Sequence, residues 1–258
     1  MTVAPLFLSA AIANSMFDAL ISLTNLGMLS LEPPGWGGVL LDGFLVSIEI
    51  AIGGFGLGVL IGALGASGKL YGGLVTRDLL EVYTTLVRAI PELILILLLY
   101  YAGTGLVNQA LAAFGRDPID ISGLVAGIVV IGFVQGAYST EVIRGAIKSI
   151  PPGQIEAARA YGMGPILIFR RVILPAMLPY ALPGLGNLWM IATKDTALLA
   201  VVGFTELTLA TRQAAGATKA YMTFYLAAGA LYLALSLVSA LIIKALDAHF
   251  RRGIARPA

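Results

Sequence analysis

The chain has 258 residues, of which 59% are hydrophobic and 12% are charged, and its net charge is +2. Its mean hydropathy of +0.92 lies outside the range of water-soluble globular domains, so we expect an all-α integral membrane protein. No cysteine is present, which excludes disulfides, thiolate metal sites and cysteine nucleophiles, and the single histidine, His249, lies in a polar tail. The small net charge gives no indication of nucleic-acid binding, and no metal site is expected.

The first 36 residues contain no lysine or arginine, which argues against a cleaved signal peptide, because that signal needs a positive region before its apolar core. Residues 1–31 are rich in alanine, leucine and phenylalanine, but two asparagines, an aspartate and the turn at 32–35 interrupt the apolar pattern. Two interpretations therefore stay open for the N-terminal extension, residues 1–36: a helix on the outer face of the membrane, or an extra span.

Five later stretches are apolar and long enough to cross a bilayer, which takes about 20 helical residues. They are residues 38–66, 79–107, 121–146, 176–202 and 222–246. Eleven lysines and arginines lie on one side of these spans and three on the other. The positive-inside rule then places both loop 148–175 and the C-terminal tail, residues 249–258, in the cytoplasm. The spans and this loop together form one membrane domain, residues 37–248.

Glycines recur every four residues along the first span, at Gly54, Gly58 and Gly62. Small residues at this spacing let two helix backbones approach closely, and we expect the groove to serve packing between subunits. No Gly-Lys-Ser or Gly-Lys-Thr follows these glycines, so we expect this chain not to bind ATP itself.

The polar loop begins with Pro151-Pro152-Gly153, which cannot continue the preceding helix because prolines lack a backbone donor. We therefore expect a new short helix to begin near Gln154. Glu156 would lie in its first turn, where a carboxylate complements the positive end of the helix. Ala157 and Ala158 would leave a low-relief face that a partner surface can approach.

A left-handed turn is expected at Gly162, directly after this short helix, and Pro175 is expected to end the helix that follows. The loop reads Glu156-Ala157-Ala158, three residues, Gly162, nine residues, then Val172-Ile173-Leu174-Pro175. This spacing resembles the cytoplasmic coupling loop of bacterial ABC importer permeases, with valine at a position where the family pattern has isoleucine.

Three further blocks, residues 83–93, 136–158 and 194–198, are similar to polar amino acid uptake permeases. Within that family, Glu92 after Pro91 and the run at 179–184 look most like the histidine and lysine-arginine-ornithine permeases. Opine permeases are of the same type, and these possibilities stay open.

The resemblance implies a permease core of five transmembrane helices in the bacterial inner membrane, with no enzyme activity of its own. It also implies four kinds of neighbour: cytoplasmic ATPase subunits that hold ATP and Mg²⁺, a homologous second permease subunit, a periplasmic amino acid binding protein, and membrane lipid. The helix at 154–164 would dock into the ATPase. Cationic amino acids are the expected cargo; opines or acidic amino acids, or an ATP-independent secondary carrier, are the alternatives.

Placing an ionisable residue within a span costs free energy, so each such residue is a candidate for the substrate path. Glu49 and Glu92 would suit a cationic cargo, although Glu49 could equally be a buried carboxylate that fixes helix packing. Lys194 and Asp195 follow a stretch with three prolines and two glycines, residues 175–186, which predicts a broken helix lining a cavity. We expect one or both of these residues to face the path or the partner permease.

Two pairs of opposite charges have the spacing of ion pairs within one helix. Arg88 and Glu92 are four residues apart, and Glu141 and Arg144 are three apart. The first pair would satisfy Glu92 without any cargo. For the second pair, a structural role is favoured over a cargo contact.

Overall fold

The computed structural model describes residues 26–118 and 122–251, and all regular structure in these ranges is helical. The prediction for an N-terminal helix or span within residues 1–25 lies outside the described residues. The longer elements are α2 (Gly37–Tyr71), α3 (Leu74–Ala89), α4 (Glu92–Ala113), α5 (Gly123–Lys148), α6 (Pro152–Ala160), α8 (Leu174–Asp195), α9 (Leu207–Thr218) and α10 (Tyr221–Phe250). Short helical turns complete them: η1 (Leu26–Leu29), α7 (Pro165–Ile168), η2 (Phe169–Ile173) and η3 (Thr196–Val202).

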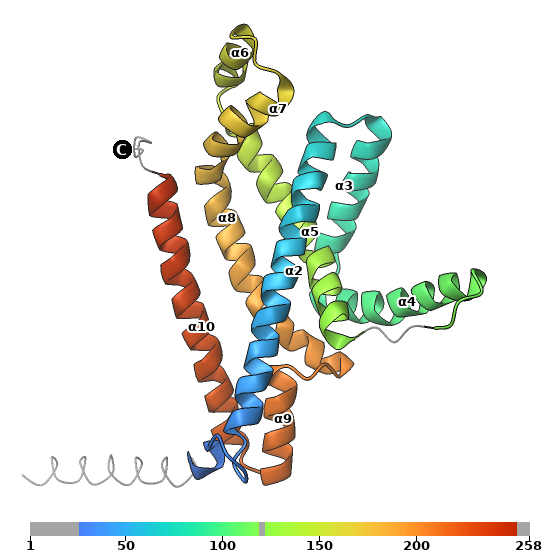
Figure 1. The fold of residues 1–258 in the computed structure, drawn as a ribbon, viewed down its shortest axis with the longest axis vertical. Helices are drawn as coiled ribbons and strands as arrows, with labels where there is room; N and C mark the ends of the chain where they lie inside the picture. Colours follow the sequence, from blue (N-terminus) through green and yellow to red (C-terminus); the bar gives the residue numbers. More distant parts are fainter. Residues whose placement is uncertain (1–25, 119–121, 252–258) are drawn as a thin grey trace, which may run out of the picture.

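Five helical segments in the described ranges are long and apolar enough to cross a membrane, as the sequence predicts. Figure 1 shows α2, α5, α8 and α10 running along the long axis, with α6 and α7 at one end and α9 at the other. The C-terminal ends of α2 and α10 lie at the end that carries α6 and α7. The fold thus places the polar loop at the same end of the bundle as the C-terminal ends of α2 and α10.

The central contact of the bundle is the packing of α2 on α5 (Figure 1). The glycine stripe of α2 makes it possible, because a Cβ atom at Gly58 would meet the Cβ of Gln135 at 2.8 Å and one at Gly62 would collide with Ser139. The prediction that this groove serves subunit packing is therefore wrong for this face. The groove is filled by α5 of the same chain.

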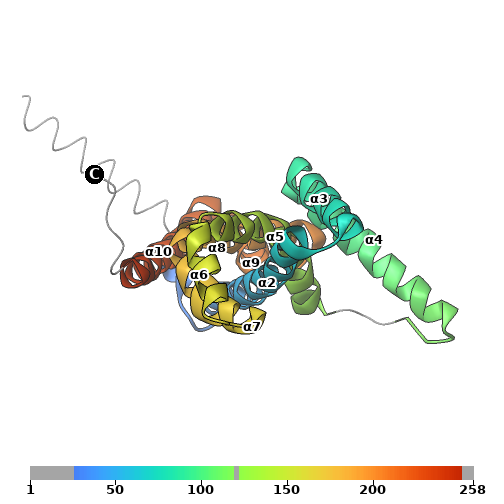
Figure 2. The same cartoon turned by 90° about the horizontal axis from the view of Figure 1, so that it is seen from above.

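The predicted second span, residues 79–107, is divided into α3 and α4. The helix stops because Pro91 has no backbone donor and forces Ile90 into an extended conformation, with ψ of 138°. In Figure 1, α3 returns beside α2, whereas α4 projects away from the bundle. Seen from above, α3 and α4 lie on one side of the molecule and α10 on the other (Figure 2).

The predicted break within residues 175–186 is absent, because α8 is continuous from Leu174 to Asp195. Pro175 starts this helix instead of ending the previous one, and the chain departs from α geometry in the π turn at 169–173 and the 3-10 turn at 196–202. Pro179 and Pro183 remain inside the helix because tertiary packing holds it. Added Cβ atoms at Gly184 and Gly186 would meet Val142 of α5 and Ile243 of α10, both at 2.7 Å.

Candidate functional site

The predicted coupling element, residues 151–175 of the predicted loop 148–175, is a helix–turn–helix at one end of the bundle (Figure 1). Its first helix begins at Pro152, so Glu156 lies in the second turn and the prediction of a first-turn carboxylate is wrong. The proline itself serves as the first helical residue, since its missing donor would have no partner there. Gln154, Glu156 and Ala157 are exposed and available to a partner.

Ala158 points the other way, and only 4% of its surface is exposed. It packs with Ala66 of α2, Ile143 and Ile147 of α5, and Ile173 beside α8. Ala158 therefore anchors α6 to the bundle and does not contribute to a free face, which corrects the sequence interpretation. The predicted coupling element thus shares one buried apolar cluster with three of the spanning segments.

The turn after α6 confirms the prediction of a left-handed glycine. Gly162 has φ of +73°, a conformation that side chains with a Cβ rarely adopt. The turn leaves Tyr161 85% exposed and Ile166 84% exposed on either side of it. Two large side chains are therefore exposed on this element.

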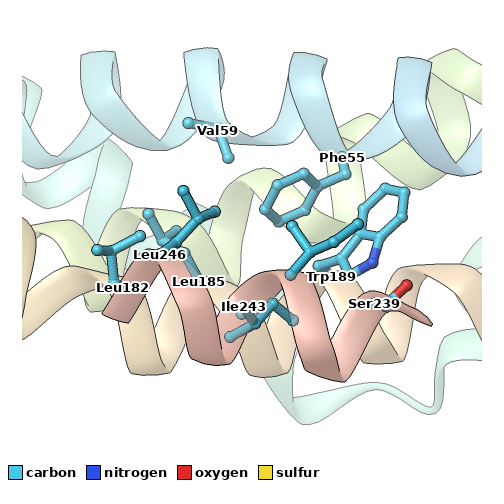
Figure 3. Close-up of a pocket in the computed structure, with 10 residues that line it drawn as sticks. Phe55, Val59, Leu182, Leu185, Trp189, Ser239, Ile243 and Leu246 are labelled. Atoms are coloured by element: carbon cyan, nitrogen blue, oxygen red, sulfur yellow. The ribbon is translucent and has the colours of Figure 1, made fainter. Parts of the chain in front are cut away.

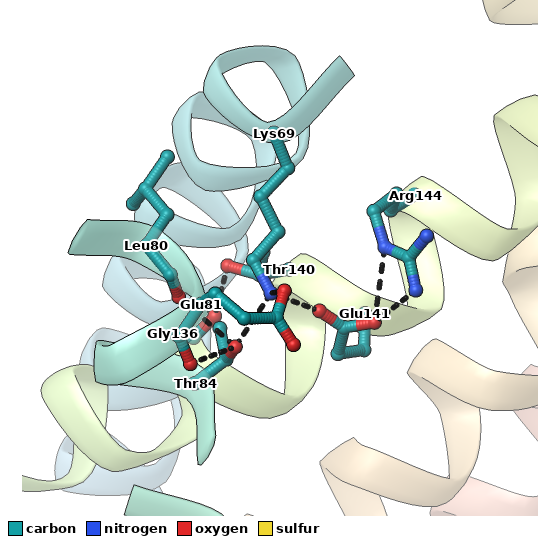
Figure 4. Close-up of polar contacts among 8 residues, drawn as sticks. All are labelled: Lys69, Leu80, Glu81, Thr84, Gly136, Thr140, Glu141 and Arg144. Carbon is teal, nitrogen blue, oxygen red and sulfur yellow. Dashed lines mark hydrogen bonds and ion pairs between the residues drawn. The ribbon is translucent and has the colours of Figure 1, made fainter. Parts of the chain in front are cut away.

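Beside the coupling element lies a charge cluster formed by Lys69, Glu81, Thr84, Glu141 and Arg144 (Figure 4). The predicted Glu141–Arg144 ion pair is confirmed, with 2.6 Å between the Arg144 Nη2 and Glu141 Oε2 atoms. The sequence did not indicate that Lys69 belongs to this cluster, because Lys69 is one of several basic residues near a loop. Its side chain is only 4% exposed and its Nζ lies 2.7 Å from Glu141 Oε1.

A second polar cluster lies deeper in the bundle, where α5 meets α8. Gln135 is fully buried, and its Nε2 donates to Asp195 Oδ2 over 3.1 Å, while its Oε1 has no hydrogen-bond partner among the described residues. Glu92, at the start of α4, lies close enough to Asp195 to interact with it electrostatically. The structure thus brings Glu92 and Asp195 together across the break that separates α3 from α4.

The same break overturns the predicted Arg88–Glu92 pair. Arg88 ends α3 and Glu92 begins α4, so the two residues are not on one helix, and within residues 26–118 and 122–251 the structure has no ion pair between them. Lys194 and Glu49 are both exposed on this chain. The interpretation of Glu49 as a buried packing carboxylate is therefore wrong for the single chain.

At the opposite end, Glu206 forms a third polar site that the sequence did not indicate. It is fully buried; its carboxylate accepts from the backbone N–H of Leu209 over 2.9 Å and from the hydroxyls of Ser47 and Tyr232, each over 3.2 Å. Burial raises the pKa of Glu206 above its ordinary value, against the opposing effect of these hydrogen bonds. It caps α9, an element that the hydropathy pattern leaves as a connecting stretch.

An apolar groove of about 360 Å³ lies between α2, α8 and α10 (Figure 3). Phe55 and Trp189 form one wall, with ring centroids 5.5 Å apart in an edge-to-face arrangement. Ser239 supplies the hydroxyl group of the groove, and the other lining side chains are hydrocarbon or the indole of Trp189. A polar cargo would find few partners here, so the groove is not a candidate cargo site.

A multi-pass membrane component with five apolar spans, buried charges between them and a polar helix–turn–helix at one end has the features of a transport permease subunit. The chain belongs to the family of binding-protein-dependent transport system inner membrane components, whose model matches residues 54–252. This places the protein in the inner membrane as a permease and not among enzymes.

Relatives agree along nearly the whole chain. The octopine transport system permease protein OccQ of Rhizobium radiobacter is 37% identical, covering 89% of this chain and 97% of its own length. The histidine/lysine/arginine/ornithine transport system permease protein HisQ of Escherichia coli is 40% identical, with 86% and 97% covered. The nopaline transport system permease protein NocQ of Agrobacterium fabrum is 42% identical, with 83% and 92% covered. The resemblance to polar amino acid and opine permeases is thereby confirmed.

Among solved structures, an amino acid ABC transporter crystallised with histidines has a chain that superposes with a TM-score of 0.69 at 27% identity, covering 83% of this chain and 95% of that chain. A chain of the methionine ABC transporter MetNI, in inward-facing conformations, superposes with a TM-score of 0.60 at 22% identity, covering 81% of this chain and 96% of that chain. The second likeness supports the fold alone.

Proposed function

We propose that this chain is one permease subunit of an ATP-driven importer that takes up cationic amino acids. The observation that carries the proposal is the predicted coupling element, which is exposed on its outer side and whose Ala158 is buried in one apolar cluster with residues of α2, α5 and α8. A rigid mount of this kind converts a push on the element into movement of the spans. The chain itself would hold no ATP; ATP and Mg²⁺ would bind cytoplasmic ATPase subunits.

The docking surface would consist of the exposed side of α6 and the turn after it, from Gln154 to Gly164. Glu156 would contact the ATPase directly, and Gly162 would allow the tight exit that sets the angle between α6 and α7. Leu174 and Pro175 would begin the span that carries the movement inward. This assignment also orients the chain, with the coupling element and the C-terminus of α10 on the cytoplasmic side.

The cargo path would pass the carboxyl groups of Glu92 and Asp195. Carboxylates in a low-dielectric site favour a guanidinium or ammonium group, because such a cation supplies charge-assisted hydrogen bonds. Exposed Lys194 lies next to Asp195 and could hold the α-carboxylate of the same cargo. Glu49 would face the path or the second permease subunit, since a carboxylate exposed within a span needs polar surroundings.

The names of the relatives favour this cargo, because a histidine/lysine/arginine/ornithine permease and an arginine permease, ArtQ of Escherichia coli, are among them. Opines are the second candidate, favoured by the octopine and nopaline permeases. We further propose a homologous second permease subunit and a periplasmic binding protein as partners, in keeping with the family's description as binding-protein-dependent.

The test is uptake of labelled amino acids and opines into liposomes that carry this chain with its neighbouring permease, ATPase and binding protein. ATP-dependent uptake of arginine, lysine, ornithine or histidine is the expected result. Uptake without ATP would contradict the importer assignment, and ATP-dependent uptake of opines or acidic amino acids alone would contradict the cargo. Asp195→Asn should raise the KM for cationic cargo; an unchanged KM would contradict the proposed path.

A further inference from the structure

Lys69 lies in the last turn of α2, and its charged side chain is buried among polar groups of α3 and α5 (Figure 4). An ammonium group has three N–H donors, and here each has an acceptor: Glu81 Oε2 at 2.7 Å, Thr84 Oγ1 at 2.6 Å and Glu141 Oε1 at 2.7 Å. Two of these acceptors belong to α3 and one to α5. One cation therefore joins three helices.

The cluster is electrically balanced. Lys69 and Arg144 face two carboxylates, Glu81 and Glu141, so no net charge is buried. Replacing a buried ion pair with apolar groups is often neutral or stabilising, so a cluster of this kind is weak evidence for stability. Its geometry is the more informative property, because ion pairs fix which parts of neighbouring helices lie opposite each other.

The position of the cluster relates it to coupling. Glu141 lies on the same helix as Ile143 and Ile147, which belong to the same buried apolar cluster as Ala158 of α6. Ala66, one turn before Lys69 on α2, belongs to that same packed group. The coupling element thus rests on the ends of α2 and α5, and Lys69 ties these two ends together and to α3.

We propose that Lys69, with Glu141 as its main partner, is a positioning residue for energy coupling: it makes the ends of α2, α3 and α5 move as one body with the coupling element. The proposal rests on the proposed function as an ATP-driven importer. Without the contacts of Lys69, a displacement of α6 would move α5 but would move α2 and α3 only in part. Less cargo would then be transported for each ATP hydrolysed.

The Lys69 ammonium group can be removed by substitution without leaving a buried charge unpaired. In Lys69→Met, Glu141 keeps its ion pair with Arg144, and the Thr84 hydroxyl keeps its bond to the Leu80 carbonyl. The Glu81 carboxylate is 71% exposed and can be hydrated. The matched control is Glu81→Gln, which removes a carboxylate from the same cluster while Lys69 still binds Glu141.

The experiment measures ATP hydrolysed and cargo transported by the assembled complex in liposomes. ATP-dependent uptake by the unchanged complex tests the proposed function; the ratio of ATP to cargo in the variants tests this proposal. We expect Lys69→Met to assemble normally and to raise the ratio about fivefold, the lower range of coupling between distant sites, while Glu81→Gln leaves it unchanged. A Lys69→Met ratio equal to that of the unchanged complex, or equal rises in both variants, would overturn the proposal.

A second measurement separates a specific tie from general loosening. If Lys69 acts through Glu141, the change produced by Lys69→Met should be largely absent in a Glu141→Gln background, because the partner is already altered. Independent changes that multiply in the double variant would overturn the proposal. Proportional loss of hydrolysis and transport together would also overturn it.

Discussion

At the end that carries the coupling element, α2 is tied to α3 and α5 by the ion pairs of Lys69, whereas at the opposite end it is tied to α9 and α10 by hydrogen bonds around Glu206. The first set joins side chains across helices. The second also reaches the backbone, since Ser47 Oγ accepts from the N–H of Leu207 and Glu206 accepts from that of Leu209. Side-chain ion pairs tolerate some reorientation, but caps on backbone donors do not. We therefore expect the Glu206 end to stay fixed while the Lys69 end moves with the ATPase.

The largest effect should come from separating the two helices that connect these ends. Gly62→Val places a side chain against the Ser139 and Thr140 backbone, and overpacking of this kind should cost about 3 kcal/mol or more. Gly56→Val on the same helix meets nothing within 4 Å and is the control. Thermal unfolding and gel filtration in detergent should show loss of the folded chain for the first variant alone. Equal behaviour of the two would contradict the packing argument.

A smaller but more specific effect is expected at the coupling turn. Gly162→Val forces a β-branched residue into a left-handed conformation, which costs about 1–2 kcal/mol, or roughly a tenfold shift in the docked population. Gly115, at the end of α4, has a similar φ of +67° and lies away from the coupling element. Gly115→Val should therefore show similar strain and normal ATP-dependent uptake, whereas Gly162→Val should lose uptake. Normal uptake by Gly162→Val would rule out the proposed role of the turn.

At the fixed end, Glu206→Ala should lower the free energy of unfolding by about 1–3 kcal/mol, because it removes the side-chain acceptor of the buried Leu209 N–H and one hydrogen-bond partner from each of the Ser47 and Tyr232 hydroxyls. Glu206→Gln keeps an acceptor oxygen and should be milder. Chemical unfolding in detergent measures both, and equal losses would show that the cap is not the cause.

The raised pKa of Glu206 also predicts a pH dependence. The folded state binds a proton that the unfolded state releases at lower pH, so this contribution to stability is complete below the unfolded pKa and is lost as pH rises through the folded pKa. Glu206→Gln should flatten the stability curve across that interval. A curve unchanged by the substitution would assign the pH dependence to another group.

The smallest effect is expected for the Asp247–Arg251 pair on α10, which is half-exposed and joins residues of a single helix. Asp247→Asn should change the unfolding free energy by less than about 1 kcal/mol and leave the ratio of ATP to cargo unchanged. This variant is a control for Lys69→Met, because Lys69 joins three helices. An effect on coupling as large as that of Lys69→Met would mean that charge alone, and not the tie between helices, is responsible.

The apolar spans and the left-handed turn at Gly162 could be predicted from the sequence, because both depend on the properties of neighbouring residues. Apolar runs of sufficient length form membrane helices wherever they lie, and a left-handed turn needs glycine wherever it occurs. The Glu141–Arg144 pair was reached for the same reason, since its partners share one helix.

Other features could not be predicted from the sequence, because they depend on contacts between residues that are far apart in the chain. Lys69 meets Glu141, which is 72 residues later, and Glu206 meets Ser47, which is 159 residues earlier. The break at Pro91 depends on one residue, but the encounter of Glu92 with Asp195 depends on how α4 and α8 are placed.

By itself, then, the sequence determined that this protein is a helical membrane permease with a helical loop between two of its spans, because hydropathy, charge and turn chemistry act over a few residues. Only the tertiary structure decided that the glycine groove is filled from within the chain, that α8 continues through two prolines, and that Ala158 faces inward. Each of these depends on which surface packs opposite, and packing between distant segments follows from the whole fold.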